Sequence, residues 1–158
     1  RPDAMKQKSS NPMARFATAF AATALAALAF SLPATADVKT LSADAAHSLV
    51  QRGELILLDV RTPSEWAMTG MPRDSVGANV QDVDFLAQAR GAVLGDLHYP
   101  VAVICRTGNR SAMAAEKLDS AGFAEIYLIA EGMIGLDGIG DGWIKRGLPT
   151  DQFLPPDR

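Results

Sequence analysis

Short apolar runs separated by polar residues are the clearest pattern along this chain. Two of them, "LILLDV" (55–60) and "YPVAVIC" (99–105), are continuous rather than alternating. A continuous run of this length is typical of a strand that is covered on both faces of a sheet. Weaker runs at 38–41, 76–80 and 124–129 predict three further strands.

Helical periodicity fills the intervals between these runs. Ser42 precedes a segment with apolar residues on one face, and Gly53 follows it, which predicts a capped helix. Pro63 stands near the first turn of a second, shorter helical segment. The helices expected from the pattern cover residues 43–52, 62–70, 82–90 and 109–121.

Strands that alternate with single helices indicate a parallel sheet, because each return to the same edge requires a right-handed crossover. The pattern therefore predicts an α/β domain, a doubly wound parallel sheet with helices on both faces, over residues 37–149. A Gly-rich stretch after residue 130 predicts a loop that leads to a last helix near Trp143. Residues 150–158 are expected to form an irregular tail.

The N-terminal segment has a different composition from the rest of the chain. After Met5 come basic residues, then the apolar run "FATAFAATALAALAF" (16–30), then "SLPATA". This order predicts a secretory signal peptide over 5–36 that is cleaved after Ala36. The alternative is a membrane anchor, but the run is shorter than the roughly 20 apolar residues that a bilayer requires. We therefore expect a periplasmic or secreted protein with no stable membrane insertion after cleavage.

The net charge of the chain limits the classes of partner that we expect. The whole chain of 158 residues carries a formal charge of −3, and residues 37–158 contain 11 Lys and Arg against 17 Asp and Glu. An acidic domain argues against nucleic acid and against anionic membrane surfaces as partners. Two isolated histidines, His47 and His98, have no metal-ligand spacing.

Cys105 is the only cysteine, and it stands where the second apolar strand meets the strongest helix. A single cysteine in an exported protein indicates a reactive thiol or an intermolecular bridge. In "CRTGNRS" (105–111), Gly108 allows a loop whose backbone N–H groups turn inward, and Arg106 and Arg110 add positive charge. Such a loop at a helix N-terminus favours a thiolate and can hold an anion.

Three segments of the chain resemble the rhodaneses, a family of sulfurtransferases, and in particular their single-domain members. "CRTGNRS" resembles the cysteine loop of that family, and "LLDVRTPSEW" (57–66) resembles its Asp-Val-Arg signature. The segment 131–149 is similar to its Gly-rich closing segment. Residues 69–80 depart from the family, which has a Gly-His-Ile-Pro-Gly-Ala sequence there, so we expect a reshaped site edge between Met71 and Val76.

The resemblance implies a two-step transfer of sulfane sulfur. Cys105 would attack a donor such as thiosulfate, become a persulfide, and pass the sulfur to cyanide or to a thiol acceptor, which could belong to a protein. No metal or organic cofactor is implied. Arg106, Thr107, Gly108, Asn109 and Arg110 would bind the substrate, with Arg110 also bracing the loop, and Asp59, Arg61, Glu65 and Ser111 would support the active site.

Two other functions stay open at this point. A phosphatase or arsenate reductase would use a similar anion cradle, but related phosphatases have five residues between Cys and Arg, and here there are four. A non-enzymatic persulfide carrier or redox module would keep the same cysteine and dock onto another exported protein.

Overall fold

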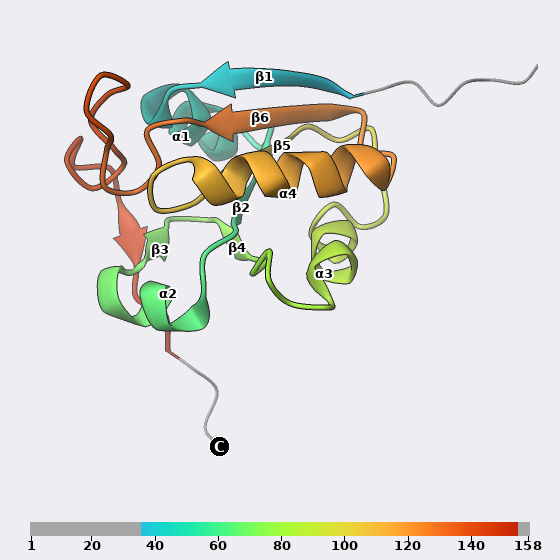
Figure 1. Cartoon of the computed structure of the whole chain (residues 1–158), viewed down its shortest axis with the longest axis horizontal. Helices are drawn as coiled ribbons and strands as arrows, with labels where there is room; N and C mark the ends of the chain where they lie inside the picture. Colours follow the sequence, from blue (N-terminus) through green and yellow to red (C-terminus); the bar gives the residue numbers. More distant parts are fainter. Residues whose placement is uncertain (1–35, 155–158) are drawn as a thin grey trace, which may run out of the picture. The chain divides into compact units, whose positions relative to one another are not determined.

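Five parallel strands form the central sheet, in the order β1-β6-β5-β2-β4 (Figure 1). Its register places Leu58 beside Val103, and Val103 beside Leu128. The computed structural model describes residues 36–154. The strands are β1 (Asp37–Leu41), β2 (Ile56–Asp59), β4 (Val76–Gly77), β5 (Val101–Ile104) and β6 (Glu125–Ile129).

Four helices connect these strands, close to where the sequence predicts them. Ser42 accepts a hydrogen bond from the Ala45 N–H and so caps the first helix. The third helix begins at Phe85, three residues after its predicted start at 82. The helices are α1 (Ala43–Gln51), α2 (Pro63–Thr69), α3 (Phe85–Ala92) and α4 (Asn109–Ser120).

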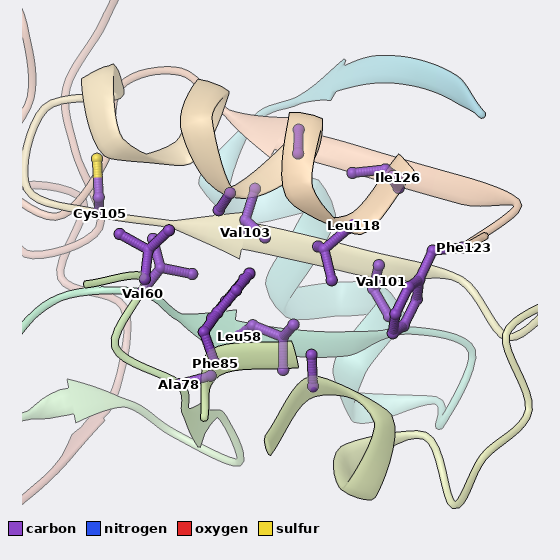
Figure 2. Close-up of a cluster of buried hydrophobic side chains, with 14 of the residues drawn as sticks. Leu58, Val60, Ala78, Phe85, Val101, Val103, Cys105, Leu118, Phe123 and Ile126 are labelled. Atoms are coloured by element: carbon purple, nitrogen blue, oxygen red, sulfur yellow. The ribbon is translucent and has the colours of Figure 1, made fainter. Parts of the chain in front are cut away.

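Two apolar clusters pack on the two faces of the sheet, which confirms the doubly wound α/β architecture. One cluster joins α3 and α4 to strands β2, β5 and β6, and Figure 2 shows it with Cys105 at its edge. The other joins α1 to the opposite face and includes Met133 and Trp143. The central strand β5 is fully buried, because its side chains reach both clusters.

The helix predicted near Trp143 is wrong. The chain forms turns there, with hydrogen bonds such as Arg146 N–H to the Gly142 carbonyl, while Trp143 is fully buried in the second cluster. Within the predicted irregular tail, Thr150–Asp151 form strand β7, which pairs in antiparallel fashion with β3 (Met71–Pro72). This two-strand ribbon holds the segment at which the sequence departs from the rhodanese pattern.

The predicted signal peptide lies outside the described residues, apart from Ala36. In the described part of the chain, no helix is both long enough and apolar enough to cross a bilayer. The predicted cleavage thus stays a prediction.

Candidate active site at the carboxyl end of β5

Cys105 lies directly after β5, with 1% of its surface exposed. Its sulfur is directed toward the first turn of α4 (Figure 2). The Gly108 backbone N–H donates a hydrogen bond to Sγ over 3.0 Å. A donor in this position stabilises negative charge on the sulfur, as does the N-terminal end of the helix that follows.

The loop between Cys105 and α4 depends on a glycine. Gly108 has a φ of 99°, and a Cβ at this residue would lie 2.6 Å from the Ala130 carbonyl oxygen. Any other residue would therefore strain the loop and push it away from β6. Within residues 36–154, the backbone N–H groups of Arg106, Thr107, Asn109 and Arg110 donate to no protein acceptor. These four N–H groups are thus available as hydrogen-bond donors to a ligand near Cys105.

The Gly-rich segment after β6 holds this loop from the other side. The Met133 N–H donates to the Cys105 carbonyl over 2.9 Å, and the Ile134 N–H donates to the Arg106 carbonyl over 3.2 Å. A Cβ at Gly132 would lie 2.5 Å from the Arg106 oxygen and 2.7 Å from the Cys105 oxygen. The segment thus packs against the loop with no room between the two backbones.

Arg110 braces the loop to α2. Its guanidinium donates to both carboxylate oxygens of Glu65, each over 2.6 Å. This contact lowers the pKa of Glu65 from its ordinary value of 4.5 to about 2, with burial opposing the shift and Thr62 adding to it. Thr62 caps α2 and also donates to Glu65, so one carboxylate closes the capping box and anchors the active-site loop.

Asp59 and Arg61 form a second, fully buried ion pair at the end of β2. Their closest contact, from Arg61 Nη2 to Asp59 Oδ2, is 2.5 Å long. Arg61 Nε also donates to Asp59. Nη1 donates to the Thr69 hydroxyl and Nη2 to the Gly70 carbonyl, each over 2.7 Å. Because every charged end has a partner, this pair fixes the turn after α2.

A cavity of about 100 Å³ opens beside the loop. Arg61 and Glu65 line it with their charges neutralised by partners, whereas the exposed Arg106 side chain has no ion-pair or hydrogen-bond partner in the described residues. Arg106 therefore leaves one uncompensated positive charge at the cavity. The remaining lining comes from Met68, Thr69 and Ile134.

The structure thus brings most of the predicted site residues together, in different surroundings. Thr107 is half-buried in the loop, and Asn109 is exposed at the start of α4. Ser111 is buried, and its hydroxyl has no hydrogen-bond partner in the described part of the chain. In that same part, no group of three or more His, Cys, Asp or Glu side chains could hold a metal ion.

Sequence reasoning missed the contribution of Gly132, Met133 and Ile134 to this site. Glycines repeat every two to three residues over 132–142, which indicates close backbone contacts, but the pattern does not name the partner segment. The sequence places Met68 in a helix and Thr69 at the start of the segment that departs from the family, and nothing in their spacing identifies them as cavity residues.

Comparison with known proteins identifies a matching family and a similar sequence. The Rhodanese-like domain family matches residues 42–136. The thiosulfate sulfurtransferase GlpE of Pseudomonas syringae is 32% identical over 97 residues, which cover 61% of this chain and 84% of that protein.

The same fold is found in solved structures of other proteins. The polysulfide-sulfur transferase homodimer of Wolinella succinogenes is 31% identical, with a TM-score of 0.57 over 72% of this chain and 78% of that one. The M. tuberculosis protein Rv0390 is 29% identical, with a TM-score of 0.58 over 75% of this chain and 100% of that one.

Proposed function

Because the chain belongs to the rhodanese-like domain family, we propose that it is a sulfurtransferase that carries sulfane sulfur as a persulfide on Cys105. The observation that carries the proposal is the hydrogen bond from the Gly108 N–H to Cys105 Sγ, within a loop whose other N–H groups have no acceptor in the described residues. This arrangement favours a thiolate nucleophile and leaves donors for a second sulfur atom.

The first step forms the persulfide. The Cys105 thiolate attacks the outer sulfur of thiosulfate, a new S–S bond forms, and the S–S bond of the donor breaks, so that sulfite leaves with the electron pair. Arg106 attracts the anionic donor, because it is the uncompensated charge at the cavity. The loop N–H groups then stabilise the negative outer sulfur of the persulfide.

The second step returns the cysteine to its starting state. Cyanide or a thiolate attacks the outer sulfur of the persulfide, and the Cys105 thiolate leaves with the electron pair of the broken S–S bond. Neither step needs a metal or an organic cofactor. Two similar proteins, a thiosulfate sulfurtransferase and a polysulfide-sulfur transferase, support sulfane sulfur as the transferred group.

Intact mass spectrometry tests this function directly. We expect the protein to gain one sulfur atom after incubation with thiosulfate and to lose it on addition of cyanide. Cys105→Ser should gain none, because a serine hydroxyl stays protonated and cannot form a persulfide, while the similar size of oxygen preserves the packing. An alkylated wild-type sample is the control, because its blocked sulfur can no longer attack the donor.

The outcomes also separate the alternatives. Thiosulfate:cyanide activity that survives Cys105→Ser would refute the proposed mechanism. Sulfur loading without turnover on cyanide or small thiols would favour a persulfide carrier, and hydrolysis of a phosphoester without sulfur loading would favour a phosphatase.

A further inference from the structure

We propose that Glu131 is a positioning residue for the Cys105 loop, acting through the backbone of Gly132–Ile134. This inference rests on the proposed function only in taking Cys105 as the nucleophile. Glu131 itself does not belong to the loop and does not line the cavity beside it.

The Glu131 carboxylate is buried and tied to α1. Its side chain is 6% exposed, and Oε1 accepts a hydrogen bond from the Ala43 N–H over 2.8 Å. Ala43 is the first residue of α1, where the helix dipole favours a negative charge. Arg146 Nη2 lies 3.5 Å from the same oxygen. A buried carboxylate needs such partners, and these fix Glu131 to the helix on the opposite face of the sheet from α4.

The backbone of Glu131 starts the turn that follows β6. Its carbonyl accepts from the Gly135 N–H over 3.0 Å, and the Gly132 N–H donates to the Ile129 carbonyl over 3.1 Å. Glu131 is therefore held by its side chain to α1 and by its carbonyl within this turn. Displacing the side chain would remove the hydrogen bond that ties this turn to the start of α1, and leave packing such as that of Met133 in the second cluster to hold the turn.

The same turn sets the direction of two peptide groups in the active-site loop. The Met133 and Ile134 N–H groups bind the carbonyls of Cys105 and Arg106. Each of these carbonyls belongs to the same planar trans peptide group as the N–H of the following residue. In a trans peptide the C=O and the N–H point in opposite directions. Fixing the two carbonyls thus fixes the N–H groups of Arg106 and Thr107, two of the donors without a protein acceptor.

The turn at Gly132 packs directly against the Cys105 loop. A Cβ at Gly132 would lie within 2.7 Å of both loop carbonyl oxygens. A movement of the turn must therefore move the loop or break its hydrogen bonds. The donors would then lose the orientation that stabilises the Cys105 thiolate and the persulfide.

Two substitutions test this inference. Glu131→Gln keeps an oxygen that can accept from Ala43 but removes the charge, and Glu131→Ala removes both. We expect kcat to fall on the order of tenfold in Glu131→Ala, because small displacements of catalytic groups have effects of this size or larger. KM for thiosulfate should change little, since the Arg106 side chain stays exposed beside the cavity. Glu131→Gln should lie between wild type and Glu131→Ala.

Alkylation of Cys105 by iodoacetamide gives a readout that needs no turnover. In the Glu131 variants, the alkylation rate at neutral pH should fall relative to wild type, because the thiolate loses oriented donors. Glu125→Gln is the matched control, since Glu125 lies at the other end of β6 and is partly exposed. Val93→Ala controls for stability, because Val93 is buried in the first cluster away from the loop.

The result that would overturn the inference is a Glu131→Gln protein that melts at a lower temperature, as Val93→Ala does, yet keeps the wild-type kcat and alkylation rate. If Glu131→Ala does not fold, Glu131→Gln decides the question. A wild-type protein that gains no sulfur from thiosulfate would instead refute the proposed function, and the alkylation rates would still test the role of Glu131.

Discussion

Arg106 and Arg110 lie four residues apart in the sequence and have different surroundings in the fold. Arg106 is exposed at the cavity, whereas Arg110 is held by Glu65. The resemblance predicts that both bind the substrate, with Arg110 also bracing the loop. Which of them is free depends on where Glu65 lies, 45 residues before Arg110, and no local pattern contains that information.

Arg106→Ala is expected to impair donor use without affecting stability. Loss of a charge-assisted contact should lower kcat/KM for thiosulfate roughly ten- to hundredfold, mostly through KM. The melting temperature should stay within a degree or two, because surface substitutions change stability by at most about 0.5 kcal/mol. Arg110→Ala, in contrast, should lower both. Steady-state kinetics and thermal unfolding of the two variants check this, and unchanged kinetics in Arg106→Ala would remove this residue from the site.

Glu65 gives the fold a defined dependence on pH. Its folded-state pKa of about 2 lies below its ordinary value of 4.5, so the contact with Arg110 stabilises the protein above that ordinary value. The stabilisation should fade as the pH falls from about 4.5 toward 2, because the carboxylate takes up a proton in the unfolded state while the ion pair keeps it charged in the folded state.

Glu65→Gln therefore should cost about 1.5–3 kcal/mol of unfolding free energy at neutral pH, the range for hydrogen bonds to charged groups. Its difference from wild type should shrink below pH 4.5. Urea unfolding at a series of pH values measures this, with Glu116→Gln on the exposed surface of α4 as the control. A difference that is the same at pH 3 and pH 7 would contradict the assignment.

At the level of elements, the strands and helices that carry strong periodicity could be predicted from the sequence. The runs at 55–60 and 99–105 contain β2 and β5, because burial on both faces demands continuous apolar side chains. The segment after β6 could not be predicted in the same way. Its hydrogen bonds go to the cysteine loop and to its own turns, so its conformation depends on contacts distant in sequence.

The ribbon of β3 and β7 shows the same limit. Each strand has two residues, too few for an alternating pattern, and the partners are 78 to 80 residues apart. The candidate site was partly predictable for a related reason. The loop motif identified Cys105 and its neighbours, whereas the residues that hold the loop lie in other elements.

Substitution of Gly108 tests the geometry of the loop that joins Cys105 to α4. Gly108→Ala forces a Cβ to within 2.6 Å of the Ala130 carbonyl at a φ of 99°. We expect a loss of about 1–3 kcal/mol in stability, the usual cost of such strain, together with slower persulfide formation. Gly91→Ala in α3 is the matched control, because its Cβ would meet nothing within 4 Å and alanine favours the helix. Equal melting temperatures for the two variants would contradict the strained geometry.

At the scale of the whole molecule, the order of segments near the N-terminus predicts processing. We expect the mature protein to start at Asp37, the first residue of β1, which keeps that strand complete. N-terminal sequencing of the protein recovered from the periplasm or medium checks this. A protein recovered from the membrane fraction with Met5 still present would contradict it.

The cysteine loop has a consequence for the order of events during synthesis. Its supports come from Glu65 in the first half of the chain and from Gly132–Ile134 near the end. A chain that emerges from the ribosome N-terminus first has translated Cys105 well before these last supports exist. The loop therefore lacks this support until Gly132–Ile134 have been made, and the specific chemistry of the thiol appears only with the cooperative closure of the parallel sheet, a slow class of folding step.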